Sequence, residues 1–274
     1  RKADQDLKAR VAQDPKLAAA TGDPWGDITK AQVSLKALYW RYGMMETRAG
    51  IGSDLFRYGR QLVRAAAEKS KANADRLPEY TDSRLALLSK TILDARPVYP
   101  ELEQVALEFW LSKLRENLTV DSAGTKLFLG KDSPETLGAR LAKSQLRDPK
   151  VRKALWDGGM AAIQASSDPM IKFILATDAM SRSVRKDYEN QVTGPVDRAA
   201  QKIAAARFQI YGSSIYPDAT FSLRLSYGKV AGWTDNGVTV APFTYYKGLW
   251  ERATGQFPFA LMPRWKSAQA KVNQ

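Results

Sequence analysis

Histidine and cysteine are both absent from the 274 residues of this sequence. Histidine is the commonest general base and metal ligand, so these residues by themselves cannot complete a Ser-His-Asp triad. Without cysteine there is no disulfide framework, no thiolate nucleophile and no sulfur-ligated zinc, and cysteine usage permits any cellular compartment. We expect no metal and no cofactor.

Long apolar runs are also missing. A membrane span needs roughly 18 such residues, and the longest apolar patches, such as 171–176, are short. We predict a soluble chain without a membrane partner, whose 44% hydrophobic content is enough for a core. The sequence begins with Arg1 and residues 1–13 read as a charged helix, so we expect any targeting segment to lie upstream.

Basic residues outnumber acidic ones by 42 to 29, which gives a formal charge of +13. Such an excess would suit a nucleic acid, an anionic membrane surface or acidic peptides. However, Arg57 and Arg60 alternate with acids such as Asp54 and Glu68, and no block of five like charges occurs. This distribution favours a solvated helix surface over a nucleic-acid interface.

Asp followed by Pro marks several expected helix starts, because Asp caps the first free N–H groups and Pro fits the first helical position. These pairs are Asp14-Pro15, Asp23-Pro24, Asp148-Pro149 and Asp168-Pro169. Ser133-Pro134 and Tyr99-Pro100 predict two more starts. The chain should be dominated by capped helices.

Between these starts, apolar residues recur with the spacing of amphipathic helices. One stripe contains Trp25, Ile28, Leu35, Leu38, Tyr39, Tyr42 and Met45, and a second contains Leu102, Val105, Phe109 and Leu114. A third contains Leu55, Phe56, Leu62, Val63 and Ala66, and a fourth Val196, Ala199, Ile203 and Ala206. We expect these stripes to be the faces through which the helices pack.

After Gly212 the apolar period changes to two, with Phe221, Leu223 and Leu225 on one face of an expected strand. A second strand is predicted at 229–233, followed by a tight turn at Asn236-Gly237 and a third strand at 238–240. The segment 248–273 mixes a helical turn around 249–252 with an irregular stretch. We place a domain boundary near Gly212.

Two motifs resemble catalytic or phosphate-binding signatures, and we reject both. Ser183 and Lys186 fit the S-x-x-K pattern of serine acyl enzymes, but K-T-G is absent and both residues fall within a predicted helix. Residues 124–132 resemble a phosphate loop that is one residue too long and lacks the Ser or Thr that binds magnesium.

Carboxylate pairs are the remaining acid–base option. The candidates are Glu101 with Glu103 and Glu108 with Glu116. We interpret them as surface pairs with basic neighbours, because this is the commoner role of helical glutamates.

The segment 76–85 is a polar and aromatic linker between helices that could line a cleft. We interpret it first as a structural corner. In it, Arg76 and Arg84 would pair with Glu79 and Asp82.

The sequence also resembles a known family. The matching motifs are Tyr216-Pro217-Asp218-Ala219-Thr220-Phe221-Ser222-Leu223-Arg224-Leu225-Ser226-Tyr227-Gly228, Pro242-Phe243-Thr244, Leu62-Val63-Arg64 with Glu68, Arg76-Leu77-Pro78-Glu79-Tyr80, and Arg207-Phe208 with Tyr211-Gly212. With these motifs the chain resembles the bacterial dipeptidyl-peptidases of serine peptidase family forty-six over nearly its whole length.

This resemblance implies a mainly α fold: a multi-helix cap domain at 1–211, followed at 212–274 by the start of a C-terminal portion that returns into a chymotrypsin-like double β-barrel. The catalytic His and Asp of the family would then precede Arg1, and its nucleophilic Ser would follow Gln274, so the chain would be an inactive internal fragment. The family's substrate-binding motifs cannot be matched to positions of this sequence, and we therefore name no catalytic residue.

The implied parent enzyme is a periplasmic or secreted serine exopeptidase that releases dipeptides from peptides with a free N-terminus. The implied partners are those peptides and the remainder of the protease barrel. A second copy of the protein, in a homodimer, is a further partner that the resemblance allows. Two alternatives from other classes are a basic helical module that binds nucleic acid or acidic partners and a helical cell-wall enzyme with a lone catalytic Glu.

Overall fold

The computed structural model describes residues 2–212, 226–235 and 237–272, and divides the chain into two compact units, Arg1–Ile215 and Tyr216–Gln274. The assignment of 1–211 to a cap and of 212–274 to a barrel portion stays a prediction.

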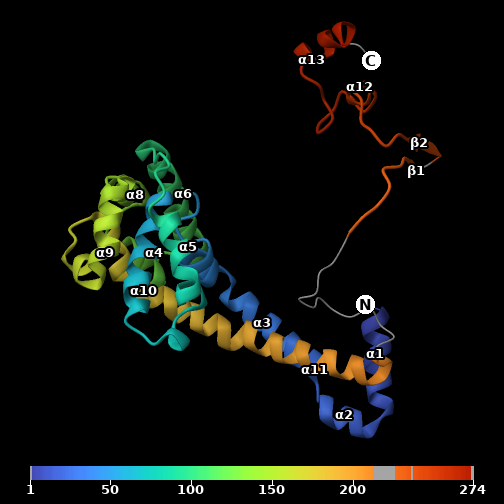
Figure 1. The fold of residues 1–274 in the computed structure, drawn as a ribbon, viewed down its shortest axis with the longest axis horizontal. Coiled ribbons are helices and arrows are strands. Elements are labelled where there is room, and N and C mark those ends of the chain that lie inside the picture. The colour runs from blue at the N-terminus through green and yellow to red at the C-terminus, as the bar shows by residue number, and fades with distance from the viewer. Residues whose placement is uncertain (1, 213–225, 236, 273–274) are drawn as a thin grey trace. The chain divides into compact units, whose positions relative to one another are not determined.

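Helices build the first unit (Figure 1). They are α1 (Lys2–Gln13), α2 (Pro15–Thr21), α3 (Pro24–Tyr42), α4 (Asp54–Lys69), α5 (Asp82–Ile92), α6 (Pro100–Leu118), α7 (Ala123–Leu129), α8 (Pro134–Leu141), α9 (Pro149–Ala165), α10 (Pro169–Tyr188) and α11 (Gly194–Tyr211). Short helical turns connect them: η1 (Gly43–Thr47) and η5 (Glu189–Thr193) are π-helical, and η2 (Asn73–Asp75), η3 (Pro78–Tyr80) and η4 (Gln145–Arg147) are 3₁₀.

The predicted helix starts are confirmed. Asp14, Asp23, Asp148 and Asp168 each accept a hydrogen bond from an amide of the first turn of their helix, as N-caps do. Ser133 caps α8 in the same way, while α6 begins at Pro100 without a side-chain cap. Asp168 also accepts hydrogen bonds from the Ser144 hydroxyl and the Gln145 amide, so this cap ties α10 to the turn before α9.

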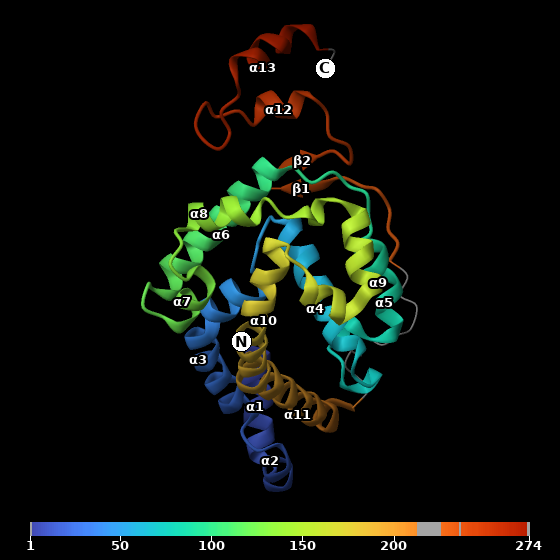
Figure 2. The same cartoon turned by 90° about the vertical axis from the view of Figure 1, so that its left-hand side faces the viewer.

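The helices form a bundle from which a helix pair extends. Figure 2 shows α4 and α10 between α6–α8 on one side and α5 and α9 on the other. From this bundle α3 and α11 run side by side, and α1 and α2 pack against the far end of α11 (Figure 1). We call the α3–α11 pair the stalk.

Two hydrophobic clusters stabilise these parts. The bundle core centres on Trp110, whose ring meets Phe56, Phe128 and Phe173 edge-on with centroids 4.8–6.1 Å apart, and whose indole N–H donates to the Met44 carbonyl. A smaller cluster at the far end of the stalk contains Leu7, Val11, Leu17 and Ala206. The stalk is thus held by apolar packing at both ends.

The apolar stripes are confirmed on α4 and corrected on α6. Every member of the α4 stripe is buried. On α6, by contrast, Leu102, Val105 and Phe109 are 61%, 62% and 57% exposed, and of the predicted stripe only Leu114 lies in the core. The helix is apolar on two faces, and the buried face is the one that contains Leu107.

The stalk stripes are buried only in part. Leu38 and Met45 are buried, whereas Tyr39 is 43% exposed. On α11, Ala199 and Ala206 are buried and the other two members are half-buried. Outside the bundle, α3 and α11 contact mainly each other, so each can bury only a narrow strip of its apolar side.

The second unit contains a hairpin, in which β1 (Trp233–Asp235) pairs antiparallel with β2 (Val238–Val240) and Trp233 lies opposite Val240. Gly237 has a φ of 82°, as the predicted tight turn requires. The first strand of this hairpin begins at Trp233, so its predicted start at Lys229 was wrong. The strand predicted around 221–225 lies outside the described residues.

Two short helices, α12 (Lys247–Glu251) and α13 (Pro263–Ala268), complete the described part of this unit, together with the 3₁₀ turn η7 (Gln269–Lys271). The helical turn expected around 249–252 is therefore present. Across both units, no helix in the described ranges has the length and apolar character that a membrane crossing requires.

Candidate functional site

A buried network of charged side chains lies where η1, α4 and α10 meet. Arg64, which is 3% exposed, donates both terminal nitrogens to Glu46 and its Nε to Asp178, all at 2.6 Å. Arg182 donates to Asp178 at 2.6 Å and to Glu68 at 2.5 Å. We call these five residues the charge network.

Glu68 is the most enclosed carboxylate of this network, with a fully buried side chain. Its oxygens accept from Lys71 Nζ at 2.8 Å, from the Leu77 amide at 2.8 Å and from Arg182. Burial by itself raises the pKa of Glu68, but these donors outweigh burial and lower the pKa to about 2. Glu68 is therefore a charged, fully engaged anchor and not a proton donor.

Arg64 holds its charge for a similar reason. Burial alone lowers the pKa of Arg64, and the hydrogen bonds and charges of Glu46 and Asp178 more than offset this, so that the pKa rises above its ordinary value. The cation and its two acceptors are stable only together, because each would be an unpaired buried charge without the others.

Beside the charge network lies a cavity of about 320 Å³, which we call the arginine cavity. It is lined by Tyr42, Glu46, Thr47, Arg57, Arg60, Gln61, Arg64, Glu79, Tyr80, Leu88 and Arg185. These side chains come from α3, η1, α4, η3, α5 and α10, so the cavity is a product of the tertiary fold and not of one loop.

Glu79 and Tyr80 show that the 76–85 linker both turns the chain and lines a cavity. The predicted pair of Arg76 with Asp82 is present at 2.6 Å. Glu79 pairs instead with Arg185 of α10 at 3.0 Å, so its predicted arginine partner within the linker was wrong. Burial raises the pKa of Tyr80 to about 12, and its hydroxyl stays protonated near neutral pH.

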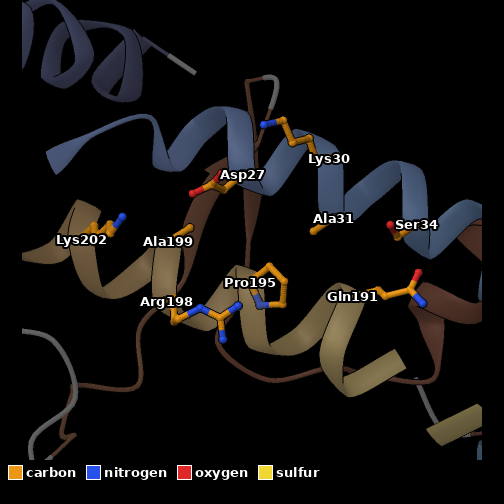
Figure 3. Close-up of a pocket in the computed structure, with 9 residues that line it drawn as sticks. All are labelled: Asp27, Lys30, Ala31, Ser34, Gln191, Pro195, Arg198, Ala199 and Lys202. Carbon is orange, nitrogen blue, oxygen red and sulfur yellow. The ribbon is translucent and has the colours of Figure 1, made fainter. Parts of the chain in front are cut away.

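A second hollow, of about 340 Å³, lies along the stalk (Figure 3). Its cations Lys30, Arg198 and Lys202 make no ion pair within the described part of the chain. In Figure 3 the Lys30 side chain points away from α11, whereas Asp27 points toward it. The cations thus do not converge on one position, and the hollow is a weaker candidate than the arginine cavity.

The predicted surface role of the carboxylate candidates is confirmed for Glu116, which pairs with Lys113, and is wrong for Glu103. Glu103 is buried, and its oxygens accept from the Ser53 hydroxyl and from the Asp54 and Leu55 amides at 2.5–3.1 Å. It caps the start of α4 from a neighbouring helix, which corrects our interpretation of it as a surface residue.

The other carboxylate candidates are structural or exposed. Glu108 accepts a hydrogen bond from Gln104 at 2.8 Å, and Glu116 pairs with Lys113 at 2.6 Å. Glu101 is exposed at the start of α6. None of these geometries pairs two carboxylates across a cleft.

The first rejected motif lies on a helix, as predicted, and the second begins within one. Ser183 and Lys186 are exposed on α10. Gly124 and Thr125 are buried in α7, where Ser122 supplies the N-cap, so this segment is not an open phosphate loop.

Sequence reasoning missed Glu46, Asp178, Arg182 and Arg185 as members of one site. The available signal was a charged residue at a buried helical phase, as with Arg64 directly after Leu62-Val63. The sequence did not predict that these residues meet, because Arg64 and Asp178 are separated by 114 positions in the chain.

Comparisons with known proteins agree with the fold and bear on the function. The family model described as Peptidase S46 matches residues 1–274. A curated relative, the Asp/Glu-specific dipeptidyl-peptidase of Shewanella putrefaciens (strain CN-32 / ATCC BAA-453), is 28% identical over 221 residues. That match covers 76% of this chain and 29% of the relative, so the chain spans less than a third of the relative's length.

A solved structure, the crystal structure of Porphyromonas endodontalis DPP11, has a similar fold. The TM-score is 0.52 at 18% sequence identity, and the match covers 97% of this chain and 38% of that chain. Two of the motifs on which the family resemblance of the sequence rests meet at the charge network and the arginine cavity. They are Leu62-Val63-Arg64 with Glu68, and residues 76–80.

Proposed function

Because the chain belongs to the peptidase S46 family, we propose that it forms the helical part of a dipeptidyl-peptidase, which releases dipeptides from the free N-termini of peptides. The match of the family model over residues 1–274 is the observation that carries this proposal. The curated relative is an Asp/Glu-specific dipeptidyl-peptidase, and its name supports the same reaction class.

In this proposal the enzyme is a serine peptidase whose triad is supplied by residues outside this sequence. The absence of histidine supports this, since the 274 residues offer no imidazole to activate a serine. The helical unit then acts as a cap: it limits how far a peptide enters the cleft and excludes water from it. The hairpin of the second unit would join the barrel, which is how we account for its exposed Trp233 and Val238.

The test compares the 274-residue chain with the complete protein on fluorogenic dipeptidyl substrates that carry Asp, Glu, Leu or Lys before the scissile bond. We expect release of the fluorophore by the complete protein and none by the 274-residue chain. The same substrates with an acetylated N-terminus should resist cleavage, because an exopeptidase of this kind requires a free amine. Full activity of the 274-residue chain would refute the proposal, and so would cleavage of acetylated and free substrates at equal rates.

The family membership also suggests a periplasmic or secreted enzyme with peptide substrates, and both stay proposals for the complete protein. Cell fractionation followed by the same assay tests the compartment. Activity confined to the cytoplasmic fraction would contradict it.

A further inference from the structure

Arg60 is the cation of the arginine cavity that lacks a carboxylate of its own. Its nearest carboxylate oxygen, on Glu46, is 3.6 Å away, and both oxygens of that carboxylate already accept from Arg64 at 2.6 Å. The other arginines of the wall are matched: Arg57 pairs with Asp54 at 2.5 Å, and Arg185 has two glutamate partners.

Burial makes this surplus charge costly. The Arg60 side chain is 23% exposed, and one terminal nitrogen donates to the Glu46 backbone carbonyl at 2.6 Å. Burial and then the nearby Arg64 lower the pKa of Arg60, which is the electrostatic sign of a guanidinium that is short of negative charge. The negative charge of a bound anion in the cavity would offset both effects.

Further polar atoms of the cavity wall are free to bind a ligand. Among the described residues, the Nε and second terminal nitrogen of Arg60 and the hydroxyl of Tyr80 have no hydrogen-bond partner. The Gln61 Oε1 atom is buried and likewise unpartnered. A buried acceptor without a donor costs stability, and Gln61 lines the cavity, so a rotation of its side-chain amide would let this oxygen accept from an N–H group brought by a ligand.

We propose that the arginine cavity binds a small molecule in which a carboxylate lies close to an N–H group, as in a free amino acid or a short peptide with a free C-terminus. The Arg60 guanidinium binds the carboxylate, the Tyr80 hydroxyl donates to it, and Gln61 Oε1 accepts from the ligand's N–H. A cavity of about 320 Å³ has the size of small-ligand pockets. This inference does not depend on the proposed peptidase activity.

The partners of the other wall arginines leave Arg60 as the place for an anionic group. Arg57 pairs with Asp54, Arg64 with Glu46 and Asp178, and Arg185 with Glu79 and Glu189. A charge-assisted, bidentate contact between the ligand's carboxylate and Arg60 would therefore be the strongest interaction of the ligand.

The test is a titration of the 274-residue chain with glycylglycine, followed by calorimetry and by amide chemical shifts at constant ionic strength. Glycylglycinamide, which lacks the carboxylate, and sodium chloride serve as comparison ligands. We expect saturable binding of glycylglycine that is at least about tenfold tighter than binding of the amide, as the loss of one charged hydrogen bond implies. N-acetylglycine, whose amine is blocked, mimics the C-terminal end of a longer peptide. Binding of N-acetylglycine as tight as that of glycylglycine would identify a peptide C-terminus as the ligand, and binding of glycylglycine alone would identify a short peptide with a free amine.

Arg60→Gln should weaken glycylglycine binding at least about tenfold. The matched control is Arg140→Gln, which removes an arginine that pairs with Asp132 on the surface, outside the cavity wall, and should leave binding unchanged. Tyr80→Phe, which keeps the ring, should weaken binding severalfold and provides a second variant if Arg60→Gln does not fold. The proposal is overturned by equal binding of glycylglycine and its amide, by equal binding of the wild type and a folded Arg60→Gln or Tyr80→Phe variant, or by no saturable response.

Discussion

Replacement of Glu68 by glutamine should change how the stability of the chain depends on pH. The carboxylate is fully buried and accepts from Lys71, Arg182 and the Leu77 amide. Its pKa falls from an ordinary 4.5 to about 2 in the folded chain. A folded-state pKa below the unfolded value means that ionised Glu68 stabilises the fold, fully above about pH 5 and progressively less as the pH falls toward 2.

The magnitude follows from the two pKa values. They differ by about 2.5 pH units, and each unit corresponds to about 1.4 kcal/mol, so ionised Glu68 contributes about 3 kcal/mol near neutral pH. At pH 3 about half of this contribution remains. Because glutamine resembles the protonated acid, Glu68→Gln should cost about 3 kcal/mol at pH 7 and about half as much at pH 3.

The assay is urea unfolding followed by circular dichroism, at pH values from 3 to 7, for the wild type and two variants. The control is Glu101→Gln, which changes an exposed glutamate at the start of α6. The informative quantity is the difference in free energy of unfolding between variant and wild type, since other carboxylates titrate in both proteins. A Glu68→Gln difference that stays constant from pH 7 to pH 3 would refute the reasoning.

The two faces of α6 should respond differently to truncation: Leu107→Ala, in the core, should cost about 2–5 kcal/mol, whereas Leu102→Ala, at a 61% exposed position, should change stability by less than about 0.5 kcal/mol. Urea unfolding measures both, and equal effects would contradict the described orientation of α6. Glu103→Ala should cost about 1–3 kcal/mol, because it leaves the Ser53 hydroxyl and the Asp54 amide without their acceptor. Hydrogen exchange at that amide should become faster than in the wild type, and unchanged protection would argue against the cap.

Local chemistry made much of the helical fold predictable. The Asp-Pro pairs located helix starts because both the cap and the proline act within the first turn. The stripe on α4 was informative because only one side of that helix is apolar enough to enter the core. The turn at Gly237 was predictable from its need for a positive φ.

The packing phase of α6 was not predictable from its own residues. Leu102 and Leu107 lie on different faces, both faces carry large apolar side chains, and the choice between them depends on which side α8 covers. The same limit explains Glu103. A glutamate on a helix normally faces water, and only the tertiary approach of Ser53 turns it into a buried cap.

The candidate site was less predictable still, because it is assembled from ion pairs between distant segments. Arg64 finds Glu46 and Asp178 at separations of 18 and 114 positions. A single sequence does not show which distant residues pair. Its one signal is a charged residue on the side of a helix that is expected to face the core. The composition of the 76–85 linker indicated a possible cleft wall, but only the fold shows that this linker and residues 62–68 meet at one place.

Apolar side chains in place of a buried charge network can make a fold more stable. The position of this network indicates what the charges provide instead. The network joins η1, α4 and α10 at the point where the stalk leaves the bundle, and there the rings of Tyr42 and Tyr188 stack 3.8 Å apart beside the two π-helical turns. Apolar contact is non-directional, whereas hydrogen-bonded ion pairs constrain both distance and angle. We infer that these pairs set the direction of α3 and α11 more narrowly than the core could. An apolar replacement of Arg64 together with Glu46 and Asp178 should therefore preserve the helices while it broadens the distribution of stalk directions, which spin-label distances between the stalk end and the bundle would measure.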